Sequence, residues 1–246
     1  MSVRCAAWGM ETTKVEPGWQ SAYLLHARPY RERSQLITLL TEQEGKVAAV
    51  ARTSGKQGGL MKAALQPFQP LKVSLAGQGT LKTLKGAETL SLPVPLSGDK
   101  LYCGLYFNEL AVRLLSELAQ CTELFQAYHQ CLLTLAAEEQ HESVLRYFEW
   151  ALLTHLGEAP ALSRDVTGEP LAADCCYALV AEQGFVPVGH DRGYLGAMLL
   201  ALAQQQLAPE HLAQAKHLAR TLLRPHLGNK PLRSRELFMK RINNKD

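Results

Sequence analysis

The first ninety or so residues alternate short apolar runs with turn-forming residues, as in an all-β domain. Runs of about four to eight such residues, bounded by Gly, Pro, Asn or Asp, are typical of strands. Five of them lie at 20–26, 35–40, 45–51, 71–75 and 81–84. The longer interval between the third and fourth contains Leu60–Ala64, a candidate short helix. The pattern predicts a small closed barrel, and by itself it does not choose between an OB-fold and an SH3-like barrel.

Beyond Pro93 and Pro95, which we interpret as a linker, the apolar spacing becomes that of helices. Apolar residues three and four apart share one helix face, so they mark amphipathic helices. Helices are predicted at 99–118, 124–137, 144–156, 195–205 and 209–223, with a short one at 234–241. Two β-like runs, 177–180 and 185–188, flank Glu182-Gln183-Gly184 and predict a small hairpin.

These patterns predict an α+β chain of more than one domain. Residues 1–16 show no periodicity and are expected to form a loose N-terminal extension, and a start at Met10 stays open. Residues 17–96 would form the β-barrel. Residues 97–246 would form a helical domain with a small hairpin and a basic C-terminal tail.

The composition is that of an ordinary globular protein, with 47% hydrophobic and 20% charged residues in 246. The longest uncharged run, Gly193–Pro209, is too short and too polar for a spanning helix, which needs about 20 apolar residues. The first residues lack the apolar core of a signal peptide. We therefore expect a cytoplasmic protein with no membrane partner.

The six cysteines show no metal-binding spacing, since no two are arranged as CxxC. Cys175 and Cys176 are adjacent, and a disulfide between neighbours is strained and rare. We expect reduced, mostly buried thiols and no metal site.

Charge is distributed unevenly, although the net charge is only +3. Residues 1–98 contain 12 Lys and Arg against 6 Asp and Glu, whereas residues 99–224 contain 8 against 15. Residues 225–246 are basic again, with 6 against 2. A basic part within one chain suggests a polyanionic partner such as nucleic acid.

Motifs of enzymatic chemistry are missing from the sequence. It contains no GxxxxGK[ST] loop for nucleotides, no GxGxxG fingerprint, no HExxH and no GxSxG elbow. The histidines are not spaced as metal ligands, and the carboxylates at 138, 139 and 142 read as a solvated turn. We expect a protein that binds rather than catalyses, with no cofactor.

Cations near the turns of the first half are the candidate binding residues. Loops of a barrel can bring such cations into one groove that follows a phosphate backbone. The alternative, scattered solubilising charges, stays open at this point. Because this half has few aromatic residues, electrostatics should dominate over base stacking. The candidate DNA-binding residues are Arg28, Arg31, Arg33, Arg52, Lys56, Lys62, Lys72, Lys82 and Lys85.

Several segments, in order along the chain, resemble the RecO family of recombination mediators. The opening carries Gly18-Trp19, Arg28-Pro29-Tyr30-x-Glu32-x-Ser34 and Thr41-Glu42-x-x-Gly45, followed by Leu65-Gln66-Pro67-Phe68-x-Pro70-Leu71. The helical half carries Tyr106-Phe107-Asn108-Glu109-Leu110 and Arg146-x-Phe148-Glu149-x-x-Leu152-Leu153-x-x-Leu156-Gly157. The ending Leu227-Gly228-x-Lys230-Pro231-Leu232-Arg233-Ser234-Arg235-Glu236-Leu237 is the most specific match. Together they span residues 18–237.

The resemblance implies an N-terminal OB-fold and a C-terminal helical domain. It also implies DNA repair and recombination in the RecF pathway: binding of single- and double-stranded DNA, annealing of complementary strands, and loading of RecA onto SSB-coated single strands with RecR. Such a protein would be cytoplasmic and associated with the nucleoid. Many family members carry a four-cysteine zinc site, and only Cys175 and Cys176 lie in the matching stretch here, so the chain resembles the zinc-free branch.

The resemblance further implies that the acidic, apolar C-terminal tail of SSB docks on the helical domain. Such a tail needs an apolar pocket with cations at its rim. In this acidic half we expect Arg146, Lys216 and Arg220 to border it, although ordinary intrahelical ion pairs are an equal alternative for each residue. The competing hypothesis for the whole chain is a protein–protein adaptor that docks the SSB tail and has only incidental DNA affinity.

Overall fold

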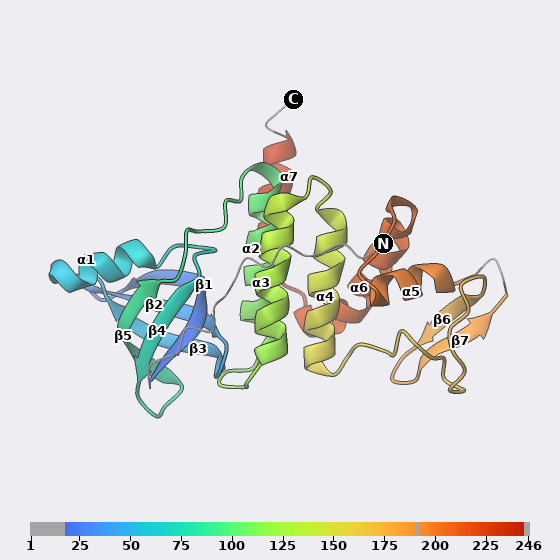
Figure 1. Ribbon diagram of the computed structural model, residues 1–246, viewed down its shortest axis with the longest axis horizontal. Helices are drawn as coiled ribbons and strands as arrows, with labels where there is room; N and C mark the ends of the chain where they lie inside the picture. Colours follow the sequence, from blue (N-terminus) through green and yellow to red (C-terminus); the bar gives the residue numbers. More distant parts are fainter. Residues whose placement is uncertain (1–17, 190–191, 244–246) are drawn as a thin grey trace.

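A five-stranded barrel and a group of helices lie side by side in the computed structural model, which describes residues 18–189 and 192–243 (Figure 1). The expected N-terminal extension, residues 1–16, lies outside this range. The barrel strands are β1 (Trp19–Tyr30), β2 (Ser34–Thr41), β3 (Gly45–Arg52), β4 (Leu71–Ala76) and β5 (Leu81–Thr89). They close in the order β1-β2-β3-β5-β4, with helix α1 (Gly55–Ala64) between β3 and β4. The predicted small barrel is confirmed, and its arrangement is OB-like.

The barrel interior follows from alternation along its strands. In β3 the side chains of Val47, Ala49 and Ala51 are fully buried, while their neighbours are partly exposed. Ile37 and Leu39 of β2 face the same interior. Since successive strand residues point to opposite faces, the alternate residues form the outer surface of the barrel. Burial of these apolar side chains contributes the main stabilisation of the barrel.

Strand β1 continues four residues beyond the predicted run, which was expected to end at Arg28-Pro29. β1 pairs with β4 only from Trp19 to Ala22, whereas it pairs with β2 as far as Tyr30. Pro29 therefore lies where β1 has a strand neighbour on one side. The proline nitrogen, which cannot donate, is tolerated at such an edge.

The helical half contains six α-helices in its described residues, with a small sheet beyond them (Figure 1). These helices are α2 (Gly98–Leu114), α3 (Thr122–Ala137), α4 (Glu142–Leu156), α5 (Gly196–Ala203), α6 (Leu212–Leu227) and α7 (Arg233–Asn243), and a 3-10 turn η1 (Pro209–His211) precedes α6. The predicted hairpin is confirmed as β6 (Cys176–Val180) and β7 (Gly184–Val188), and β8 (Tyr194–Leu195) adds an unpredicted third strand. None of the helices described is long and apolar enough to cross a membrane.

Helix α2 ends at Leu114, four residues before the predicted end, because the following loop packs against the barrel. The backbone N–H of Leu118 donates to the Lys46 carbonyl at 3.0 Å, and the Lys46 ammonium donates to the Val112 carbonyl at 3.0 Å. Gly45 has φ +69°, and a Cβ there would lie 1.8 Å from the Ala119 carbonyl oxygen. Only glycine fits this approach, so we call the contact between the β2–β3 turn and the α2–α3 loop the glycine seam.

Helix α7 is anchored through its first turn to Glu109 of α2. The Glu109 carboxylate accepts from the backbone N–H groups of Arg233 and Ser234 and from the Ser234 hydroxyl, at 2.7–2.9 Å. Burial raises the pKa of Glu109, but these bonds and Arg113 outweigh it and hold the pKa below its ordinary value. Arg113 also donates to three carbonyls, at Leu227, Lys230 and Pro231. The basic C-terminal segment is thereby fixed to the helical group.

Barrel and helices also meet through a buried tyrosine and a histidine. The Tyr23 hydroxyl of β1 is hydrogen-bonded to Nδ1 of His129 in α3, and Tyr23 packs against Phe125 and Tyr128. Burial raises the pKa of Tyr23, so the hydroxyl stays protonated and donates. Burial lowers the pKa of His129, so its neutral imidazole accepts.

This contact should make folding pH-dependent. Since the pKa of His129 is lower in the folded chain than in the unfolded chain, the unfolded chain takes up its proton first as pH falls. The stabilisation is complete above the unfolded value of about 6.5 and is lost progressively below it. We expect denaturant titrations at about pH 7 and about pH 5 to show a smaller drop in unfolding free energy for His129→Gln than for the wild type. Equal drops for the wild type and His129→Gln would contradict the assignment.

Candidate nucleic-acid interface

The strand register places two of the predicted cations on the outer face of the barrel. Residues paired across neighbouring strands point to the same side. Ile37 pairs with Ala49, and both are buried inside, so the adjacent row points outward. The outward rows are Tyr30–Ser34–Arg52, Arg28–Leu36–Val50–Thr83 and His26–Thr38–Ala48–Leu81. Arg28 and Arg52, both exposed, therefore lie on one face across three strands.

Three more of the predicted cations lie at the end of this face. Arg31 and Arg33 are exposed in the β1–β2 turn, and the Arg31 guanidinium lies 5.1 Å from the centre of the Tyr30 ring. The backbone N–H of Thr53, which leads from β3 into α1, donates to the Arg33 carbonyl at 3.0 Å. This bond brings the start of α1, with exposed Lys56, beside the turn. We call Arg28, Arg31, Arg33, Arg52 and Lys56 the cation face.

The three outward rows that carry the cation face contain no aspartate or glutamate. Their other members are His26, Tyr30 and small polar or aliphatic residues. Glu32, in the turn between Arg31 and Arg33, is the acidic residue nearest in sequence. A surface with cations and without carboxylates attracts a phosphate backbone and steers it on approach.

The remaining predicted cations of the barrel lie elsewhere. Lys62 is exposed on α1, and Lys85 is exposed on β5 beside an irregularity in its pairing with β4. The Lys72 ammonium lies 5.4 Å from the centre of the Trp19 ring, on the β4 side of the barrel. Lys82 forms an ion pair with Glu44. The latter two lysines are thus engaged within the barrel and are separated from the cation face.

In the helical half, Arg146 is buried rather than placed at a rim. Its guanidinium donates to the Glu149 carboxylate at 2.6 Å, and the Tyr106 hydroxyl donates to the same oxygen at 2.6 Å. Burial raises the pKa of Glu149, and the nearby cations oppose that shift. Arg146 Nε and Glu149 Oε2 are buried without a hydrogen-bond partner. The pair is thus enclosed and incompletely satisfied.

Lys216 and Arg220, four residues apart on α6, act electrostatically on the same carboxyl. Arg220 is exposed, and Lys216 is partly exposed and lies 3.4 Å from Glu142. The two accessible predicted cations of the helical half therefore lie over the buried Arg146–Glu149 pair. Four-residue spacing puts them on one face of the helix.

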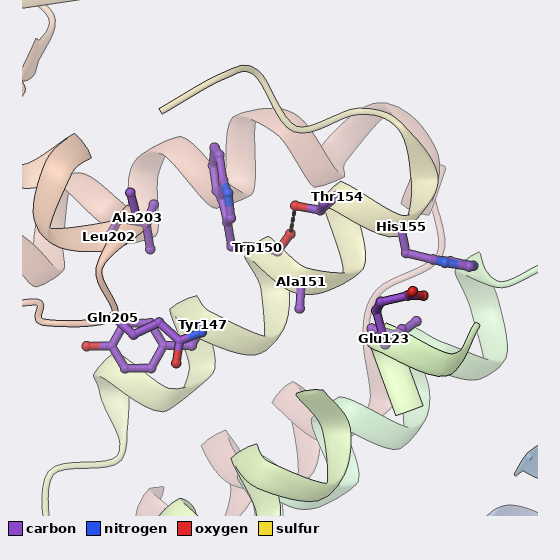
Figure 2. Close-up of a pocket in the computed structure, with 10 residues that line it drawn as sticks. Glu123, Tyr147, Trp150, Ala151, Thr154, His155, Leu202, Ala203 and Gln205 are labelled. Atoms are coloured by element: carbon purple, nitrogen blue, oxygen red, sulfur yellow. Dashed lines mark hydrogen bonds between the residues drawn. The ribbon is translucent and has the colours of Figure 1, made fainter. Parts of the chain in front are cut away.

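A cavity of about 420 Å³ lies between α3, α4 and α5, and none of these cations lines it. Figure 2 shows it with Tyr147, Trp150 and Ala151 of α4 on one side and Leu202 and Ala203 of α5 on another. The lining contains one acidic side chain, Glu123, and one imidazole, His155. No Lys or Arg lines the cavity. An acidic ligand would find no counter-charge in this cavity.

The stretch in which a zinc site was sought holds Cys175 and Cys176 at the start of β6. Cys176 is buried and Cys175 is partly exposed, and neither forms a disulfide. Within residues 18–189 and 192–243, no three His, Cys, Asp or Glu side chains are grouped as metal ligands.

Two outward residues, His26 and Tyr30, were missed by the sequence reasoning. His26 ends the predicted run 20–26, and Tyr30 lies beyond the Arg28-Pro29 pair at which that run was expected to end. Alternation continued through Arg28 and Tyr30 would have placed them on the outer face with Arg52.

Comparisons with known proteins agree with this architecture. The family model of the recombination protein O N terminus matches residues 17–93, and that of the C terminus matches residues 95–236. The chain is 43% identical over 227 residues to the DNA repair protein RecO of Erwinia tasmaniensis, covering 90% of this chain and 92% of that protein. It is also 43% identical to the RecO proteins of Serratia proteamaculans and Klebsiella pneumoniae, covering 90% of this chain and 93% and 92% of theirs. A barrel followed along the chain by a helical region, together with family models that match residues 17–93 and 95–236, thus identifies the chain as a member of the RecO family of DNA repair proteins.

Proposed function

We propose that this chain binds single- and double-stranded DNA through the cation face and anneals complementary strands. The observation that carries the proposal is the position of five cations on and beside outward strand rows of an OB-like barrel that contain no carboxylate. OB-folds bind oligonucleotides on the face of strands 2 and 3 and through the loop between strands 1 and 2. Arg52 of β3 and Arg31 and Arg33 of the β1–β2 turn occupy those positions.

Annealing by such a face needs no catalytic residue and no cofactor. Two single strands repel each other through their phosphates, and cations that neutralise one backbone lower the cost of approach. A strand held by its phosphates leaves its bases free to pair. We therefore propose a mediator without enzymatic turnover.

The family resemblance extends the proposal to partners. We propose that the chain acts with RecR to load RecA onto SSB-coated single strands in the RecF pathway, in the cytoplasm at the nucleoid. The acidic tail of SSB would dock on α6, where Lys216 and Arg220 can meet its carboxylates. Arg146 is buried beneath them, so we assign it a positioning role through Glu149 rather than a first contact.

The test is annealing of complementary oligonucleotides by the purified full chain, with binding measured as salt is raised. Each phosphate contact should contribute a slope of about −0.7 to log affinity against log salt on single strands. If all five cations of the cation face make contact, the slope should be about −3.5. Absence of annealing at low salt, or affinity that does not depend on salt, would contradict the proposal.

The adaptor hypothesis predicts a different outcome from the same preparation. A chain that retains an immobilised SSB-tail peptide but shows negligible affinity for naked DNA would be an adaptor. Arg220, exposed on a helix of an otherwise acidic half, is the observation that favours it. Binding of both ligands would support the mediator, since the two surfaces lie on different halves of the chain.

A further inference from the structure

A second hollow, of about 320 Å³, lies where the barrel meets α2. It is lined by β1 around its irregularity between Leu24 and His26, by β2, by the end of α1 with the connection to β4, and by one face of α2. Its lining residues are Leu24, Leu25, His26, Ala27, Gln35, Lys62, Leu65, Gln66, Pro67, Leu105 and Asn108. This volume falls in the range of small-molecule sites, and its walls are mostly aliphatic.

The α2 wall of the hollow contains the side-chain amide of Asn108. The Asn108 side chain is only 4% exposed, and its carboxamide oxygen accepts from the buried Tyr128 hydroxyl at 2.5 Å. Asn108 also lines the hollow, and its carboxamide nitrogen can donate two hydrogen bonds. That half of the amide is therefore suited to an acceptor atom of a ligand.

A second wall is an open strand edge. β1 pairs with β4 only through Trp19–Ala22, and beyond it Leu24 forms a single bridge to Pro67. From His26 onward, β1 has β2 as its one strand neighbour among the strands described. The free edge exposes backbone donors and acceptors, which can pair with the polar edge of a planar ligand.

The charge of the hollow matches that of the cation face. Lys62 and His26 are the ionisable residues among the eleven that line it, and none is acidic. His26, in the wall, belongs to the outward row next to that of Arg28. A polyanionic chain held at Arg28 would therefore have this hollow within reach of its next unit.

We propose that the hollow takes one unstacked nucleobase of a single strand held on the cation face. Aliphatic side chains would cover the faces of the base, and the Asn108 amide and the β1 edge would meet its polar edge. The inference rests on the proposed DNA binding and deepens it, since it adds contact with a base to contact with phosphates. Duplex DNA, whose bases are stacked and paired, would not use the hollow.

The test compares an oligothymidylate with an oligonucleotide of the same length whose central nucleotides are abasic. For the wild-type full chain we expect the abasic strand to bind about tenfold more weakly at one fixed salt concentration. Ala27→Trp, at an exposed wall position, should fill the hollow and bring this ratio close to one without weakening abasic binding. Ala63→Trp, at an exposed position of α1 outside the lining, should keep the wild-type ratio.

A second pair of variants examines the amide. Asn108→Asp keeps an acceptor for Tyr128 but places a carboxylate in the hollow, so it should bring the ratio of oligothymidylate affinity to abasic affinity close to one. Tyr128→Phe leaves the Asn108 amide in place and should keep the wild-type ratio. Equal wild-type affinity for both oligonucleotides would overturn the base site while leaving DNA binding intact, whereas no affinity for either would refute the proposed function itself. A ratio unchanged in Ala27→Trp, with loss of binding to an SSB-tail peptide, would assign the hollow to a peptide and overturn the inference.

Discussion

Replacing Arg146 with alanine should lower the free energy of unfolding by about 3–5 kcal/mol, because the Glu149 carboxylate would stay buried without its cation. The two side chains are only 7% and 2% exposed, so water cannot replace the lost partner. The Tyr106 hydroxyl alone would remain bonded to the carboxylate. Denaturant titration of the purified variant measures the loss.

The loss should depend on pH in a defined direction. Without Arg146, burial raises the pKa of Glu149 further above its unfolded value, so the folded variant holds a proton that the unfolded chain releases. Stability of the variant should then fall as pH rises through the range between the two values. The deficit relative to the wild type is expected to be larger at about pH 7 than at about pH 5.

A double variant separates loss of a partner from loss of a favourable pair. Arg146→Met with Glu149→Gln removes both charges and keeps an acceptor for Tyr106, so it should lie within about 1–2 kcal/mol of the wild type. Wild-type stability of Arg146→Ala would mean that the pair is not buried as described. The result also decides which variants can test SSB-tail docking. Lys216→Ala and Arg220→Ala report on contact with the tail without leaving a buried charge unpaired.

The second large effect concerns DNA. Arg28→Glu combined with Arg52→Glu should weaken single-strand binding about a hundredfold at low salt, since each charge-assisted contact contributes roughly 1.5 kcal/mol or more. Loss of two phosphate contacts should also reduce the salt slope by about 1.4. Both side chains are exposed on the outer rows of the barrel, so the fold should be retained. Fluorescence anisotropy of a labelled oligonucleotide at several salt concentrations measures both quantities.

The matched control is Arg192→Glu combined with Arg224→Glu, two exposed cations of the helical half, with the same change in net charge. We expect a small, long-range effect from this control. Reversal of Arg31, Arg33 and Lys56 tests the end of the cation face in the same assay. If the control weakens binding as much as the Arg28 and Arg52 reversal, net charge and not the cation face governs affinity.

The fold could be predicted from the sequence wherever local pattern determines the structure. The alternation in Gly45–Arg52 and the helical spacing in Glu142–Leu156 each gave the correct element. The ends of α2 and β1 could not be predicted, because tertiary contacts set them. Leu118 leaves the helix to bond the Lys46 carbonyl, and β1 continues past Pro29 because one of its edges is open there.

The candidate site was less accessible to sequence reasoning, since it depends on register. Nothing local distinguishes Arg52, which faces outward, from Lys82, which is paired with Glu44 of the β2–β3 turn. Likewise Arg146 and Arg220 look alike in sequence, yet one is buried against Glu149 and the other is exposed. A spacing rule gives the side of a helix or strand, but it does not say what covers that side.

The glycine seam has a mechanical consequence. With the Gly45 backbone against the Ala119 carbonyl and the Lys46 side chain bonded to Val112, the two halves of the chain have no free pivot at this point. A force on a DNA strand bound to the barrel would move the helical half together with the barrel, instead of bending the chain between them. Tension in the bound strand would then be felt at the surface where the protein partners are proposed to dock.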